Sequence, residues 1–215
     1  MGLFDWFKKS TPATAESTPA ASGTAVATLE RETDATAEAL AGTWTIDPSH
    51  SSLGFTARHA MVTNVRGSFD EVEGTGTLDL TSPSNSTVTV VMKSASINTG
   101  SADRDGHLRS ADFFDTETYP ELRFVSTSVE RADADTLRVS GDLTIKDVTR
   151  PVAIDFEFTG VATDPFGNQR AGFEGSTTIN RKDWGLEWNA ALETGGVLVS
   201  EKIKLALDIS AIKSV

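Results

Sequence analysis

The chain has 215 residues, of which 38% are hydrophobic, and this is enough for one domain with a real core. Lysine and arginine total 19 against 31 aspartate and glutamate, and the net charge of -12 disfavours nonspecific contact with phosphates, so no nucleic acid partner is expected. Because the chain has no cysteine, a disulfide framework, a zinc ribbon and a thiol nucleophile are excluded.

Residues 1–10 contain the sequence GLFDWFKK, in which the apolar side chains fall on one arc of a helical wheel. These apolar residues are Leu3, Phe4, Trp6 and Phe7. The arc predicts a weak contact of residues 2–9 with a membrane surface, although a frayed terminus explains it equally well. The sequence shows neither an apolar run of about 18 residues nor the apolar stretch of a signal peptide. We therefore expect a cytoplasmic location, peripheral at the inner membrane surface.

Residues 11–42 are rich in Ala, Thr, Ser, Pro and Glu and have few large apolar side chains. Such a segment buries too little surface to offset the entropy of ordering it, so the composition predicts a disordered linker. A weak helical tendency is expected only from Leu29 to Leu40. The folded domain is expected to span residues 43–215.

From residue 43 onward, hydrophobic side chains recur at every second position, as in half-buried antiparallel strands. The clearest segments are residues 87–92, 137–145, 152–158 and 202–209. Less regular strands are expected over residues 44–47, 52–58, 65–70, 75–80, 122–130 and 172–179. So many short strands predict an all-β fold, and the long inward side chains favour a closed barrel over a sandwich.

Two irregular segments interrupt the strands. The first, DRDGHLRSADFF at residues 103–114, predicts a short helical insertion at one end of the barrel. The second, residues 181–200, precedes the last strand. Within it, NRKDWG at 180–185 fits either a loop in which Arg181 and Asp183 are tied together or a lid that turns Trp184 toward a ligand. Together the two irregular segments suggest covers over an open end of the barrel.

A helix over the first insertion would align Asp103, His107 and Ser110 on one face, as in an acid, base and nucleophile. The chain lacks the G-x-S-x-G elbow of a serine nucleophile, and Gly106 weakens the helix, so a lid is favoured and no catalytic residue is expected. Two alternatives to a binding protein remain open. One is a hydrolase or isomerase acting on a bound lipid through His107 with Asp103 or Asp112, and the other is a stress-related interaction module.

Metal and nucleotide sites find no support in the sequence. The three histidines, His50, His59 and His107, form no metal-binding pair, so no metal is expected. The stretch DPSHS at 47–51 has the Asp-Pro signature of a turn and is interpreted as a hydrogen-bonded corner. The glycines near residue 74 do not form a dinucleotide loop. The apolar interior could be either a solid core or a tunnel, which periodicity does not distinguish.

The domain resembles the YceI-like family, the lipocalin-like polyisoprenoid-binding proteins. The motifs that carry this resemblance occur in order along the chain. They are WTIDPSHSSLGFTARH at 44–59, VRGSF at 65–69, DRDGHLRSADFFDTETYPELRF at 103–124, LTIKDVTRPV at 143–152 and INRKDWG at 179–185. Two departures are the lack of the secretory signal that many members carry, and Trp184 at a position often held by phenylalanine.

The resemblance implies an extended eight-stranded antiparallel barrel that binds, sequesters or carries an isoprenoid lipid of the quinone or polyprenyl phosphate type. No cofactor is implied besides that lipid. The oligomeric state stays open, with a homodimer as one option. By this analogy the contacts of the lipid tail would be Phe55, Met92, Leu108, Phe113, Phe114, Phe156 and Trp184. The residues of the head group or lid would be Arg58, Arg104 and His107.

Overall fold

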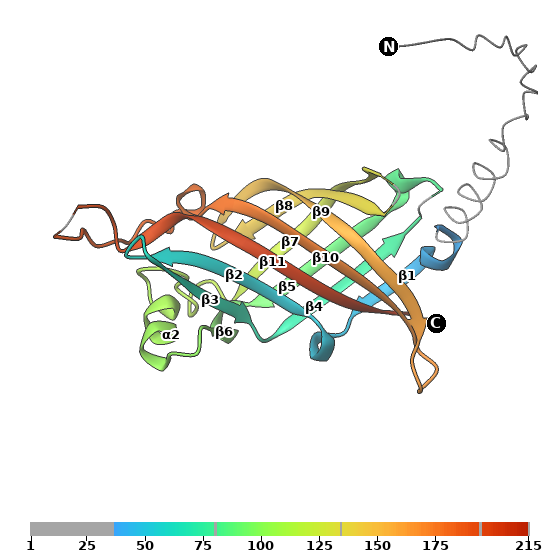
Figure 1. The fold of residues 1–215 in the computed structure, drawn as a ribbon, viewed down its shortest axis with the longest axis horizontal. Helices are drawn as coiled ribbons and strands as arrows, with labels where there is room; N and C mark the ends of the chain where they lie inside the picture. Colours follow the sequence, from blue (N-terminus) through green and yellow to red (C-terminus); the bar gives the residue numbers. More distant parts are fainter. Residues whose placement is uncertain (1–36, 80, 134, 194, 215) are drawn as a thin grey trace, which may run out of the picture.

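The computed structural model describes residues 37–79, 81–133, 135–193 and 195–214, and its strands form one antiparallel sheet (Figure 1). The strands are β1 (Gly42–Ile46), β2 (Ser52–His59), β3 (Thr63–Phe69), β4 (Val72–Leu78), β5 (Thr87–Lys93), β6 (Ile97–Asn98), β7 (Glu121–Arg131), β8 (Thr136–Ile145), β9 (Val148–Thr163), β10 (Gln169–Asn180) and β11 (Val199–Lys213). The helix α2 (Ala102–Arg109) lies in the predicted insertion.

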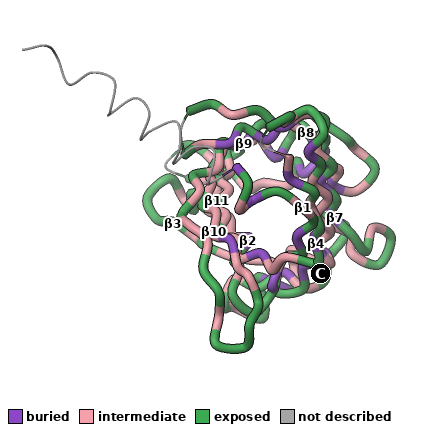
Figure 2. Tube along the Cα trace, turned by 90° about the vertical axis from the view of Figure 1, so that its right-hand side faces the viewer, coloured by how far each residue is buried: buried purple, intermediate pink, exposed green. Residues whose placement is uncertain are grey.

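The sheet closes into a barrel of eight strands. Its hydrogen-bonded order is β1-β4-β5-β7-β8-β9-β10-β11, and β11 pairs back onto β1 through Ala211↔Ile46, Ile212↔Thr45 and Lys213↔Trp44. Figure 2 shows these strands arranged around a ring when the molecule is viewed along its length. The predicted eight-stranded antiparallel barrel is therefore confirmed.

The strands β2, β3 and β6 extend this ring rather than adding to it. β11 pairs with β1 at residues 211–213 and with β2 at residues 199–208, so β1 and β2 lie end to end along the same neighbour. In the same way, β3 lies end to end with β4, and β5 lies end to end with β6. A short 3₁₀ turn at Pro48–His50 separates β1 from β2, and another at Ser94–Ser96 separates β5 from β6.

The predicted corner at Asp47 is the turn between β1 and β2. The Asp47 carboxylate accepts hydrogen bonds from the backbone N–H of Ser49 at 3.0 Å, from its hydroxyl at 2.6 Å and from the guanidinium of Arg170 at 2.6 Å. The Ser49 hydroxyl and the Arg170 charge hold the pKa of Asp47 well below its usual range. Arg170 also contacts Asp164 at 2.8 Å, so the corner is tied to the turn between β9 and β10.

One end of the barrel is closed by the residues that precede β1. Leu40 is 1% exposed and packs with Ala37 into a cluster that contains Trp44. The Trp44 indole N–H donates to the Leu40 carbonyl at 2.8 Å, and the Lys213 ammonium donates to the Ala39 carbonyl at 3.2 Å. The folded part thus includes Ala37 and Leu40, which precede the boundary expected at residue 43. We call this end the sealed end; residues 1–10, and the linker before residue 37, lie outside the described residues.

The helix α2 occupies the opposite end of the barrel (Figure 1), which we call the α2 end. Asp105 is buried and accepts hydrogen bonds from the backbone N–H and hydroxyl of Thr99. Arg109 donates to the carbonyls of Ala95 and Ile97 at 2.7 and 2.8 Å. Both contacts fix the helix to the loop around β6.

Within the described residues, none of the helices combines the length and apolar character that crossing a membrane requires.

Candidate functional site

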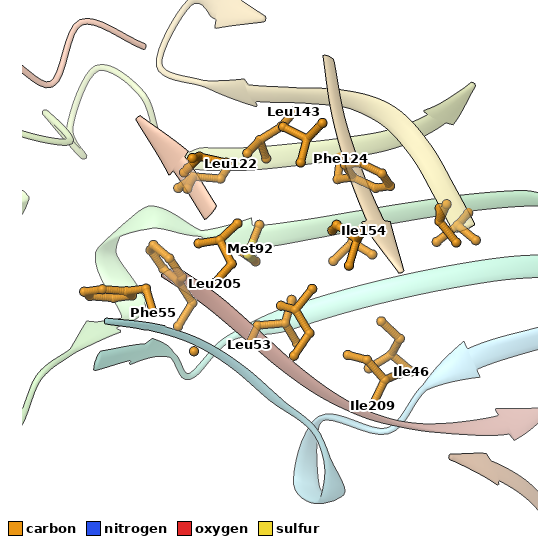
Figure 3. A pocket seen from close by; sticks show the side chains of 18 of the residues that line it. Ile46, Leu53, Phe55, Met92, Leu122, Phe124, Leu143, Ile154, Leu205 and Ile209 are labelled. Carbon is orange, nitrogen blue, oxygen red and sulfur yellow. The ribbon is translucent and has the colours of Figure 1, made fainter. Parts of the chain in front are cut away.

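An apolar cavity of about 280 Å³ lies inside the barrel. Each of the eight strands around the ring contributes side chains that face inward, and Figure 3 shows a part of them converging on a shared space. The contribution of β11 is Ile203, Leu205, Leu207, Ile209 and Ala211. The alternation recognised in the sequence therefore produces the lining directly, because every second side chain of a strand faces the same side.

The interior is hollow rather than solidly filled. Leu205, Leu207 and Ile209 face inward, yet each is only half-buried, as are Val88 and Val90 on the opposite wall. Side chains in a solid core of this size would be almost fully buried, since protein interiors are close-packed. Partial exposure on the inward face therefore indicates open space next to these side chains. Of the two options left open by the sequence, a solid core and a tunnel, the structure shows the tunnel.

Aromatic rings lie against the cavity wall instead of across it. In three places a ring sits so close to a glycine of the neighbouring strand that a Cβ atom there would come within 2.6 Å of it. The pairs are Phe55 over Gly67, Phe124 over Gly141 and Phe156 over Gly175. Any side chain at these glycines would push the ring inward, so the glycines keep the cavity open.

The cavity is long and narrow. Its lining on β11 runs from Ile203 to Ala211, which at ~3.3 Å per residue is roughly 26 Å of strand. With a strand tilt of about 40° this corresponds to roughly 20 Å along the barrel axis. One leaflet of a bilayer is about 15 Å thick in its hydrocarbon region, so the lining is long enough to hold an extended hydrocarbon chain along the barrel axis.

Six of the seven residues expected at the lipid tail lie on the cavity lining. They are Phe55, Met92, Leu108, Phe113, Phe114 and Phe156. The exception is Trp184, which is 3% exposed and is not part of the lining. Its indole N–H donates to the Leu143 carbonyl at 2.9 Å. Trp184 therefore packs behind the wall and supports it, and the lid that would turn Trp184 toward a ligand is not what the structure shows.

The three residues expected at the head group lie at the α2 end but outside the cavity lining. Arg58 donates to the Val62 carbonyl at 3.2 Å, and Arg104 donates to the hydroxyl and carbonyl of Thr99. The His107 ring packs edge-on against Trp188 at 4.5 Å between centroids. These contacts hold the loops of this end together.

The aligned Asp103, His107 and Ser110 do not form a catalytic triad. The helix ends at Arg109, and the Ser110 hydroxyl donates to the His107 carbonyl at 2.7 Å instead of contacting the imidazole. The partner of the His107 ring is Asp112, with 3.0 Å between Nε2 and Oδ2. The hydroxyl is therefore occupied by a backbone acceptor and is not activated by a base.

The charged residue that does line the cavity is Arg181, which sequence reasoning did not select. It follows the last residue of β10, and the inward positions of that strand run Phe173, Ile179 and then Arg181. The side chain is 4% exposed, and the guanidinium donates through Nε to the Ser200 carbonyl at 3.0 Å and through Nη1 to the Leu186 carbonyl. The expected tie between Arg181 and Asp183 is thus replaced by bonds to two backbone carbonyls.

The electrostatics of Arg181 are unusual. Burial lowers the pKa of its guanidinium, and the charge of Glu201 opposes this effect. Among the described residues, the Nη2 atom is buried without any hydrogen-bond partner. Elsewhere in the described part of the chain, no group of three or more His, Cys, Asp or Glu residues is placed to hold a metal ion.

Comparison with known proteins gives a consistent result. A family model described as YceI-like domain matches residues 44–211. A UPF0312 protein of Staphylococcus aureus is 41% identical over 162 residues, which are 75% of this chain and 92% of that protein. A UPF0312 protein of Pseudomonas savastanoi is 39% identical over 152 residues, which cover 70% of this chain and 79% of that protein.

Solved structures show the same barrel. A YCEI protein of Campylobacter jejuni is 28% identical, with a TM-score of 0.63, and the match covers 74% of this chain and 90% of that one. A polyisoprenoid binding domain from Saccharophagus degradans, implicated in plant cell wall breakdown, superposes with a TM-score of 0.62 at 18% identity. That match covers 80% of this chain and 98% of the other, and at this identity it supports the fold.

Proposed function

The chain belongs to the YceI-like family, and we propose that it binds a long-chain isoprenoid lipid inside its barrel, as a carrier or store of that lipid. The observation that carries the proposal is the apolar cavity, which runs from the α2 end to Trp44 at the sealed end. The Saccharophagus degradans neighbour is a polyisoprenoid binding domain, and its ligand class supports the same class here.

The energetics of such a cavity suit a hydrocarbon chain. Burying one CH₂ group contributes about 0.8 kcal/mol, so a tail of several isoprene units supplies most of the binding free energy. The gross sum would exceed the ceiling of about 18 to 21 kcal/mol for noncovalent affinity, so ordering of the chain and its loss from a membrane must offset much of it. Residues at one end of the cavity can then decide selectivity without having to supply affinity.

The proposed role is non-enzymatic. The pair of His107 and Asp112 lies outside the cavity lining, with exposed fractions of 39% and 55% for the two side chains. A bound chain would therefore not meet an acid and a base there, as general acid–base chemistry requires.

Lipid extraction of the purified protein followed by mass spectrometry tests the proposal. We expect a molecule with a prenyl chain, as an isoprenoid quinone or a polyprenyl phosphate. Native mass spectrometry of the delipidated protein, titrated with one lipid of each type, should show one lipid per barrel. Absence of a co-purified lipid together with no uptake of either added lipid would refute the proposal.

The proposal also includes a cytoplasmic location with weak peripheral contact at the inner membrane surface through residues 2–9. The amphipathic arc of that segment supports it. Flotation with anionic vesicles, compared between the full chain and a chain without residues 1–10, tests this part. Equal flotation of the two would remove the contact from the proposal.

A further inference from the structure

Arg181 places a positive charge at an otherwise apolar cavity. It is the one charged residue of the lining within the described part of the chain. The salt bridges of the described residues do not include it, and the nearby Glu201 carboxylate is paired with the Lys182 ammonium at 2.6 Å. The charge of Arg181 is therefore not neutralised by a direct carboxylate contact in this part of the chain.

A buried charge of this kind has a cost that a ligand can offset. An arginine stays protonated in proteins, so its guanidinium keeps both its charge and its five N–H donors. The backbone carbonyls of Ser200 and Leu186 accept hydrogen bonds from Nε and Nη1, respectively, whereas Nη2 has no acceptor among the described residues. Leaving a charged donor buried and unpaired is unfavourable, and a negatively charged acceptor relieves both the missing hydrogen bond and the missing counter-charge.

The position of Arg181 gives the cavity a direction. Arg181 lies with Leu108 and Leu186 at the α2 end, whereas the sealed end is lined by Trp44 and Leu78. The Trp44 indole N–H is already bonded to the Leu40 carbonyl, so the sealed end offers no free side-chain donor among these residues. An amphiphile with a long tail therefore fits with its polar group at the α2 end and its tail toward Trp44.

We propose that Arg181 binds the phosphate of a polyprenyl phosphate and so selects an anionic head group over an uncharged one. This inference rests on the proposed binding of an isoprenoid lipid and deepens it by naming the head group. Phosphate oxygens match the donors of a guanidinium and bring the negative charge that the described surroundings lack. The carbonyl of a quinone would accept a hydrogen bond but would leave the charge of Arg181 uncompensated.

Binding of two lipids that differ only in the head group tests the proposal. The affinities of a polyprenyl phosphate and of the polyprenyl alcohol with the same chain are measured on the full chain and on Arg181→Met. The full chain should bind the phosphate at least roughly tenfold more tightly than the alcohol, the size of one hydrogen bond to a charged group. Arg181→Met should abolish the preference, so that the ratio of the two affinities falls to about one.

Arg104→Met is the matched control, because Arg104 is an exposed arginine at the same end that lies outside the lining. It should preserve the preference for phosphate. If Arg181→Met does not fold, the test is the ratio of phosphate affinity to alcohol affinity, measured for the unmodified chain and for Arg181→Lys. Lysine keeps the charge and should retain part of the preference for phosphate.

The outcomes separate the two proposals. Equal affinity of the unmodified chain for phosphate and alcohol overturns the role of Arg181 and leaves lipid binding intact. An isoprenoid quinone that binds more tightly than the phosphate, and loses affinity in Arg181→Met, overturns the choice of phosphate. Failure of all three lipids to bind overturns the proposed function itself.

Discussion

Replacing Ala57 with tryptophan is expected to weaken isoprenoid binding by at least about tenfold while the barrel stays folded. Ala57 lies on β2 and lines the cavity, so the indole would enter the space that the tail needs. Excluding two CH₂ groups from the cavity costs about 1.6 kcal/mol, which is already more than the 1.4 kcal/mol of a tenfold change. The open space beside the wall gives the new ring room, so thermal unfolding should shift little. Titration of the delipidated variant with a prenyl lipid measures the effect.

Ala206→Trp is the matched control for this experiment. Ala206 lies on the neighbouring strand β11, where it pairs with Gly54, and it is exposed on the outer face of the barrel. The same substitution there should leave the affinity unchanged. Equal loss of affinity in both variants, or unchanged binding in Ala57→Trp, would show that the interior of the barrel is not where the lipid binds.

Replacing Leu40 with alanine is expected to lower the free energy of unfolding by about 2 to 4 kcal/mol, the usual range for a fully buried leucine. Leu40 is among the most deeply buried side chains of the described residues and packs against Trp44 and Leu78 at the sealed end. Its loss would open a gap between the residues before β1 and the barrel. Chemical denaturation at equilibrium, followed by the fluorescence of the tryptophans, measures the change.

Glu38→Ala serves as the control, because Glu38 belongs to the same turn of helix but is exposed. It should change the free energy of unfolding by less than about 0.5 kcal/mol, as surface substitutions usually do. A Leu40→Ala variant as stable as Glu38→Ala would mean that the residues before β1 do not contribute to the fold.

The sequence was sufficient for the architecture because antiparallel strands leave a local signal. Alternation along β8, β9 and β11 marked the inward residues correctly, and the turn residues around Asp47 marked the connection between β1 and β2. The number of strands around the barrel came from the family resemblance, since residues 44–47 and 52–58, and likewise 65–70 and 75–80, read as separate strands in the sequence.

The sealed end was not predictable from composition. Leu40 stands in an alanine-rich stretch that lacks the density of apolar residues expected of a core. Its burial depends on contacts with Trp44, Leu137 and Ala211, which are distant in sequence or belong to other strands. Composition averages over a window and therefore conceals a single anchoring side chain.

Arg181 was missed although a signal was present. Counting in steps of two from Phe173 along β10 places residue 181 on the inward face, one residue beyond the end of the strand. The presence of Asp183 two residues later suggested an ion pair as one of two interpretations. Trp184 illustrates the opposite error, because a large aromatic residue in a loop suggested a ligand contact, whereas its indole N–H is bonded to the Leu143 carbonyl.

The meeting of β1 and β11 has a practical consequence for engineering the barrel. Trp44 is paired with Lys213, and the Ser214 N–H donates to the Thr43 carbonyl at 2.8 Å, so β1 and β11 enter and leave the fold side by side at the sealed end. In Figure 1 this end lies opposite α2. A fluorescent reporter or a surface anchor joined directly after β11 would thus attach on the side away from Arg181, leaving the α2 end unobstructed for exchange of cargo.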